Sequence, residues 1–170
     1  KLGEELALPE RLNAILDVAC SFAHADTGTI GLYDPQTDTI ATTVIRHSMP
    51  ALFATHFARG QGMAGHIIAT MRPYLGRYGD LPQPVVDDLR EHQALGVPLT
   101  WHGRLLGYMA LSLEPPRRFK AADPEMTQVL AHAAAAAIEN ASLHAQAGSA
   151  AVLAERQRLA RELHDNVTQI

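Results

Sequence analysis

Apolar residues recur at intervals of three and four between residues 9 and 24, which is typical of one face of an α-helix. Two runs rich in β-branched residues follow, over 27–33 and 39–46. The segment between them contains Pro35 and two aspartates, which favour a turn. The pattern therefore predicts a helix followed by a β-hairpin.

The pattern from residue 50 to residue 113 mixes several periods. We expect a short helix over 50–58 and a second helix that follows the glycines of 60–65 and ends near Met71, because Pro73 cannot continue it. The glycines and prolines of residues 74–84 predict a loop. Residues 85–92 are predicted to form one or two helical turns. The strands predicted for a second hairpin span 94–100 and 105–113.

From Pro124 the pattern is helical to Ile170, and Asp123 is a suitable N-cap. A helix of this length needs a partner chain or a coiled-coil seam to bury its apolar stripe. The phase of the stripe shifts near Gly148 and Ser149, so we expect a kink or stutter between two helical pieces there. After the shift, heptad positions are occupied by Leu153, Ala160, Leu163, Val167 and Ile170.

The composition narrows the class of protein. With 170 residues, the chain fits one domain of about 150 residues plus an appendage. Its 47% hydrophobic residues can fill a core, which excludes a disordered chain, and a net charge of −4 argues against nucleic-acid partners. Apolar stretches fall well short of the ~20 residues that a bilayer requires, so we expect no membrane contact.

The single cysteine, Cys20, excludes an intramolecular disulfide and a cysteine-based zinc site, and favours a reducing compartment. We therefore expect a cytoplasmic chain, with an upstream membrane anchor in a longer protein left open. The chain begins without Met and stops inside a helical pattern that lacks a C-cap. These ends suggest an excised piece of a longer protein.

Candidate chemistry is concentrated in the last sixteen residues, 155–170, which read ERQRLARELHDNVTQI. His164 and Asp165 are adjacent there, and Gln169 completes an H-D-x-x-x-Q pattern. This segment resembles the dimerisation and phosphoacceptor helix of sensor histidine kinases. The subfamily that it resembles usually acts on response regulators with a helix-turn-helix output domain.

The resemblance assigns His164 as the phosphoacceptor. A neutral imidazole is a nucleophile at physiological pH and can accept the γ-phosphoryl group of ATP on Nε2. A carboxylate at Asp165 would hold the other ring nitrogen as N–H and stabilise the developing imidazolium. By resemblance, Gln169 orients the water that dephosphorylates the partner regulator, and Thr168 is a weaker candidate for that role. The alternative is that these residues are simply solvated on a charged helix face.

The same resemblance implies the partners. A histidine kinase of this type is a homodimer, and ATP and Mg²⁺ are bound by a separate catalytic domain. No glycine-rich phosphate-binding loop follows His164 in the sequence. We therefore expect the chain to be inactive alone and to receive phosphate only in trans.

Residues 5–147 resemble a GAF domain over their whole length. The resemblance is carried by the order of a helix, a hairpin, the segment Gly60-x-Gly62-Met63-Ala64-Gly65 opening a helix, the second hairpin and a long exit helix. It implies an α/β (α+β) fold with an antiparallel sheet flanked by helices. The exit helix would lead into a dimeric helical bundle, with residues 148–170 forming the signalling helix and the start of the phosphoacceptor helix.

By resemblance, GAF domains commonly sense a small ligand or serve as dimerising relays, and the sequence does not name a ligand. Histidines in the pocket region (His47, His56, His66) are more often structural than ligands of haem or metal, so we expect no metal. An apolar pocket would be lined by Phe53, Met63, His66, Ile67, Met71 and Tyr74, although any core contains such residues.

Two other functions stay open. The chain could be a GAF-type ligand-binding or dimerisation module whose last helix forms a coiled coil without catalysis. A stand-alone enzyme is the third possibility, but residues 5–147 contain no nucleophile and base arrangement that we recognise.

Overall fold

The computed structural model describes residues 7–47 and 56–167, with residues 163–167 described by their backbone. The chain enters through α1, Leu8–Ala23, which confirms the predicted first helix. Its buried face contains Leu12, Leu16 and Cys20 at the helical spacing of the sequence pattern. His24 adopts a left-handed conformation and donates its N–H to the carbonyl of Cys20, which ends the helix.

Both predicted hairpins are confirmed. The first joins β1, Thr27–Asp34, to β2, Thr39–Arg46, and the second joins β5, Gln93–Trp101, to β6, Arg104–Leu113. All these pairs are antiparallel, and β1 also pairs with β6, so the two hairpins share one continuous sheet. The central strands are therefore distant in sequence but adjacent in space.

The sheet has six strands in the order β3-β2-β1-β6-β5-β4. Its two edge strands correct the sequence prediction. Residues 56–58 of the predicted helix 50–58 form β3, His56–Ala58, and residues 50–55 lie outside the described residues. The predicted loop 74–84 contains β4, Tyr74–Arg77. Each short segment is held by backbone hydrogen bonds to a longer strand, a tertiary effect that outweighs local propensity.

The connections between strands form short helices. A confirmed helix, α2, spans Gly62–Thr70, and short 3₁₀ turns occupy Tyr78–Asp80 and Asp87–Leu89. Gly65 lies where α2 approaches the end of β3, and a Cβ atom there would be 2.1 Å from the carbonyl oxygen of Ala58. The close approach requires glycine at this position.

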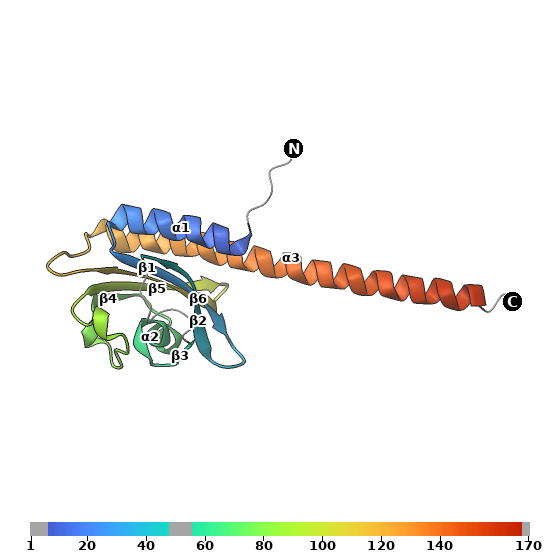
Figure 1. Cartoon of the computed structure of the whole chain (residues 1–170), viewed down its shortest axis with the longest axis horizontal. Coiled ribbons are helices and arrows are strands. Elements are labelled where there is room, and N and C mark those ends of the chain that lie inside the picture. Colours follow the sequence, from blue (N-terminus) through green and yellow to red (C-terminus); the bar gives the residue numbers. More distant parts are fainter. Residues whose placement is uncertain (1–6, 48–55, 168–170) are drawn as a thin grey trace. The chain divides into compact units, whose positions relative to one another are not determined.

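Helices cover the two faces of the sheet differently. α1 and the first part of α3, which spans Ala122–Val167, lie on one side, and α2 lies on the other (Figure 1). Asp123 lies within the first turn of α3 instead of preceding it as predicted, and its carboxylate accepts the N–H of Lys120 at 2.6 Å. The observed fold is therefore of the α+β class, with an antiparallel sheet flanked by helices.

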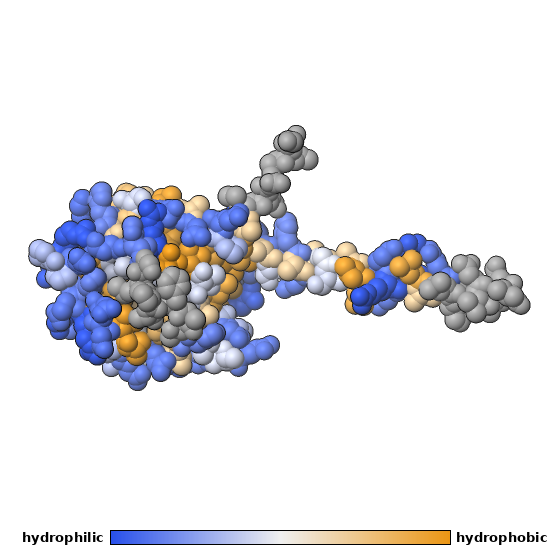
Figure 2. All heavy atoms as spheres, viewed as in Figure 1, coloured by the Kyte–Doolittle hydropathy of each residue, from blue (hydrophilic) through white to orange (hydrophobic). Residues whose placement is uncertain are grey.

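The chain divides into two compact units, residues 1–137 and residues 138–170. We call the first the sheet domain and residues 138–162 of the second the distal helix. The distal helix is α-helical through Gly148 and Ser149, so the two predicted pieces are joined without a break, and the kink or stutter stays a prediction. Figure 2 shows orange patches on this helix. Its exposed large apolar side chains include Leu143, Val152, Leu153 and Leu159.

Among the described residues, no helix is long and apolar enough to cross a bilayer.

Candidate functional site

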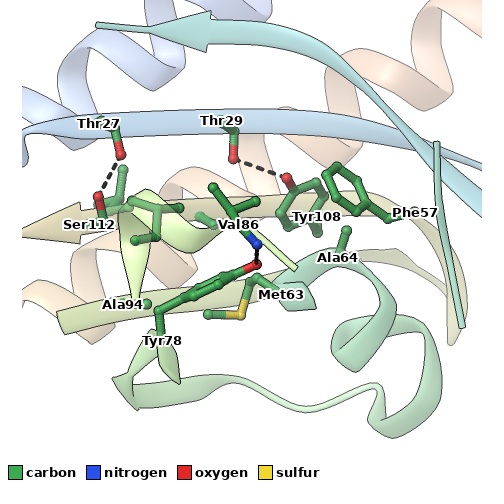
Figure 3. Close-up of a pocket in the computed structure, with 13 residues that line it drawn as sticks. Thr27, Thr29, Phe57, Met63, Ala64, Tyr78, Val86, Ala94, Tyr108 and Ser112 are labelled. Atoms are coloured by element: carbon green, nitrogen blue, oxygen red, sulfur yellow. Dashed lines mark hydrogen bonds between the residues drawn. The ribbon is translucent and has the colours of Figure 1, made fainter. Parts of the chain in front are cut away.

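A cavity of about 40 Å³ lies on the face of the sheet that α2 covers (Figure 3). Strands β1, β5 and β6 form one wall, and the opposite wall comes from β3, α2 and the connection between β4 and β5. It is lined by Thr27, Thr29, Phe57, Met63, Ala64, Tyr78, Val86, Leu89, Ala94, Tyr108, Ala110, Leu111 and Ser112.

Hydroxyl groups from the two central strands line the sheet side of the cavity. Thr27 and Thr29 alternate along β1, as Tyr108 and Ser112 do along β6, which places these side chains on the same face. The Oγ1 of Thr27 lies 2.5 Å from the Oγ of Ser112, and the Oγ1 of Thr29 lies 3.1 Å from the hydroxyl oxygen of Tyr108 (Figure 3). The central strands thus carry two hydrogen-bonded hydroxyl pairs into the core.

The opposite wall is mainly apolar, and it includes one further hydroxyl group. Met63 and Ala64 are buried on the first turn of α2, and Met63 lies against Gly96, where a Cβ atom would be 2.3 Å from its sulfur. The hydroxyl of Tyr78 accepts the N–H of Val86 at 3.3 Å. This wall offers hydrophobic contact with a single fixed polar group.

The cavity is electrically neutral. No charged side chain is among the described residues that line it. Burial raises the pKa of Tyr108, although its hydrogen bond with Thr29 acts in the opposite direction. Burial also raises the pKa of Tyr78. Both phenols therefore remain protonated at physiological pH and can donate a hydrogen bond.

The structure places the sequence-predicted pocket residues in different surroundings. Met63 lines the cavity, whereas Ile67 is fully buried in the adjoining core. His66 makes an edge-to-face contact with Tyr74, their ring centroids 5.3 Å apart, and burial lowers the pKa of His66. Met71 is 38% exposed at the C-cap of α2. Phe53 lies outside the described residues.

Sequence reasoning missed the hydroxyl residues of the cavity. Their signal was a hydroxyl at alternate positions of an otherwise apolar strand, Thr27 and Thr29 in the first hairpin and Tyr108 and Ser112 in the second. That pattern alone does not say which face of each strand meets α2. Within the described part of the chain, no three His, Cys, Asp or Glu side chains are placed to hold a metal ion.

The predicted phosphotransfer residues belong to α3. His164 and Asp165 lie within its helical backbone, and Thr168 and Gln169 lie outside the described residues. In the turns that precede His164, Arg158 donates to Glu155 at 2.8 Å and also pairs with Glu162. The hydrogen bond from this guanidinium lowers the pKa of Glu155. The segment is therefore a regular charged helix up to the predicted phosphoacceptor.

The chain belongs to the GAF domain family, whose match covers residues 5–139. GAF domains are sensor modules of signalling proteins, which agrees with a neutral cavity between the sheet and α2. No curated protein sequence matches the chain.

Solved structures share the fold at low sequence identity. The GAF domain of a phosphoenolpyruvate-protein phosphotransferase from Acinetobacter is 14% identical, with a TM-score of 0.73 over 84% of this chain and 89% of that one. The GAF-B domain of DevS from Mycobacterium smegmatis is 19% identical, with a TM-score of 0.66 over 82% and 98%. A methyl-accepting chemotaxis protein, residues 122 to 287, is 15% identical, with a TM-score of 0.67 over 82% and 93%.

Proposed function

We propose that the chain is the sensory and phosphoacceptor part of a two-component sensor histidine kinase. The observation that carries this proposal is the position of His164 and Asp165, the first two residues of the H-D-x-x-x-Q sequence pattern, in α3, the helix that also leaves the GAF domain. A sensor domain and a candidate phosphoacceptor thus share one continuous helix. The GAF domain would regulate phosphorylation of His164, and the phosphoryl group would then pass to a response regulator with a helix-turn-helix output domain.

In the proposed reaction, Nε2 of His164 attacks the γ-phosphorus of ATP, and the bond to the β,γ-bridging oxygen breaks, releasing ADP. Asp165 would orient the imidazole through Nδ1 and stabilise its positive charge. Gln169 would position water for dephosphorylation of the regulator, with Thr168 as the weaker candidate. ATP and Mg²⁺ would be held by a separate catalytic domain.

Exposed apolar side chains on the helices support a homodimer. In the sheet domain, Val18 and Phe22 of α1 are 53% and 44% exposed, and Val129 of α3 is 63% exposed. In the distal helix, Leu153 and Leu159 are also exposed. A helix with such a stripe is stable in water when a second helix covers it, and a second copy supplies one.

The phosphoacceptor is tested by incubating the chain with γ-labelled ATP, Mg²⁺ and the catalytic domain of a kinase that carries the same motif and phosphorylates its own helix. We expect acid-labile label on the wild type and none on His164→Ala. The matched control is His144→Ala, an exposed histidine of the same helix, which should be labelled like the wild type.

Two results would reject the proposal: an unlabelled wild-type chain, or equal label on His164→Ala. If the unlabelled chain were still dimeric by analytical ultracentrifugation, the alternative would stand, a GAF-type module with a non-catalytic coiled-coil helix. The exposed leucines of the distal helix are compatible with both functions.

A further inference from the structure

We propose that the cavity under the sheet binds a small uncharged molecule with one hydrogen-bonding oxygen and an apolar remainder, such as a short alcohol or ketone. The oxygen would bind to the hydroxyls of Thr29 and Tyr108. This inference rests on the GAF sensor role in the proposed function and names the chemical class of its ligand.

The first argument is the burial of hydroxyl groups that the fold itself does not require. Thr29 is 5% exposed and Tyr108 is 3% exposed, both on a face otherwise packed with apolar side chains. Burying a hydroxyl costs free energy unless its hydrogen bonds are made, and Val or Phe would fill the same space without that cost. Their mutual hydrogen bond uses one donor and leaves acceptor sites and the second hydroxyl hydrogen for a further partner.

The second argument is that a further hydroxyl supports Tyr108 in the same row of the sheet. Gly31 of β1 is paired with Thr42 on one side and with Tyr108 on the other. A hydrogen bond with Thr42 acts, like the hydrogen bond with Thr29, to lower the pKa of Tyr108. Thr42 is not among the described residues that line the cavity, so it would act on the Tyr108 hydroxyl and not contact the ligand.

The charge and size of the cavity define the ligand. An anion would be desolvated without a compensating cation, because the described lining residues are uncharged, and both phenols remain protonated. A volume of about 40 Å³ holds roughly three water-sized units, far less than the ~150 Å³ that accommodates benzene. The ligand therefore has up to about four non-hydrogen atoms.

The two walls favour an amphiphilic molecule. The hydroxyls of Thr29 and Tyr108 lie on the sheet side, whereas Met63 and Val86 offer apolar contact on the other side (Figure 3). Water would satisfy the hydroxyls but leave the apolar wall without contacts, and an apolar gas would do the reverse. A short alcohol or ketone such as propan-2-ol or acetone matches both walls at once.

The test is an NMR titration of the whole chain, labelled at Met and Ala methyl groups, with propan-2-ol and with acetone. Saturable shifts are expected at Met63 and Ala64, with a Kd of about 1–10 mM for so few atoms. Met71, outside the cavity, and Met109, on the opposite face of the sheet, are internal controls and should not shift. Absence of saturable shifts at Met63 would overturn the proposal.

Variants identify the hydroxyl contribution. The double variant Thr29→Val with Tyr108→Phe removes both partners of one hydrogen bond, which limits its effect on folding, and should weaken binding at least about tenfold. The exposed control Thr43→Val should leave the affinity unchanged. Xenon should still shift Met63 in the double variant, which verifies an intact cavity. Unchanged affinity of the folded double variant would overturn the proposal.

Nitrate serves as an anionic probe of similar size. We expect no saturable shift with nitrate, and nitrate binding as tight as that of propan-2-ol would overturn the assignment to a neutral ligand. Because the titration does not involve phosphorylation, its outcome is separate from that of the His164 assay. A chain that binds acetone but is not labelled by ATP would reject the kinase role and keep this inference.

Discussion

The sheet domain and the distal helix use the same types of residue with opposite results. Leu16 of α1 is fully buried against the sheet, whereas Leu153 of the distal helix is 59% exposed. Both lie on an apolar stripe of a regular helix. A leucine contributes to stability only where a neighbouring surface removes it from water. The sheet domain therefore gains stability from its apolar stripe, whereas the exposed leucines of the distal helix add little to the stability of the single chain.

The ion pairs of the two regions show the same difference. In the sheet domain, Arg46 pairs with Asp17 and Arg117 with Asp26, which joins elements that are distant in sequence. In the distal helix, Arg158 pairs with Glu155 and Glu162, which lie three and four residues away along the same helix. Local pairs stabilise the helix itself but do not position it against anything else.

The largest expected contrast comes from matched leucine substitutions. Leu16→Ala should lower the free energy of unfolding by about 2–5 kcal/mol, because it leaves a cavity in a packed core. Leu153→Ala should change it by less than about 0.5 kcal/mol at protein concentrations below dimerisation. Urea titrations followed by the fluorescence of Trp101, the single tryptophan, measure both. Equal losses in the two variants would contradict the comparison.

A pair of glycine substitutions should give effects of opposite sign. Gly65→Ala should destabilise the sheet domain by about 1–3 kcal/mol, because the new Cβ would collide with the backbone of Ala58. A Cβ at Gly148 meets no atom within 4 Å, so Gly148→Ala should stabilise the helix by about 0.5–1 kcal/mol. Circular dichroism at 222 nm during thermal unfolding detects both changes. Destabilisation by Gly148→Ala would show that the distal helix is constrained after all.

The smallest effect concerns the pH dependence of the sheet domain. Burial raises the pKa of Cys20 from its usual 9.0 to about 11, partly opposed by Arg46. The folded state therefore keeps the thiol proton to a higher pH than the unfolded state does. The contribution of Cys20 to the free energy of unfolding is complete below pH 9 and is lost as the pH rises toward 11. At pH 10 the loss should be about 1 kcal/mol relative to pH 8.

Cys20→Ala should remove this loss of stability between pH 8 and pH 10. Urea titrations of wild type and Cys20→Ala at both pH values measure it, as the difference in free energy of unfolding between the two proteins at each pH. Using the difference cancels the contribution of buried tyrosines, whose pKa values are also raised. As a control from the distal helix, Ser149→Cys should add no pH dependence, because an exposed thiol titrates alike in the folded and unfolded states. Parallel pH profiles of wild type and Cys20→Ala would contradict the assignment.

Local pattern predicted the elements that carry strong periodicity. The first helix and both hairpins follow directly from residue spacing and turn residues, and the structure agrees with them. The edge strands β3 and β4 were predicted as helix and loop, because three or four residues among glycines and prolines carry too little local signal. Their conformation depends on hydrogen bonds to β2 and β5, which lie elsewhere in the sequence.

The candidate cavity was predicted less well than the fold. Of the proposed pocket residues within the described part of the chain, Met63 alone lines the cavity. Thr29 and Tyr108 lie 79 positions apart in the sequence and meet because β1 pairs with β6. Pairing of that kind leaves no trace in the residues next to either position.

By itself, the sequence determined the helical and strand periods, the membership of the GAF family and the histidine motif at the end of the chain, since each depends on residues close together along the chain. Only the tertiary structure decided which face of β1 and β6 meets α2. A strand presents two faces of alternating residues, and packing selects the one that becomes buried. That selection placed four ordinary hydroxyl residues in the wall of a cavity.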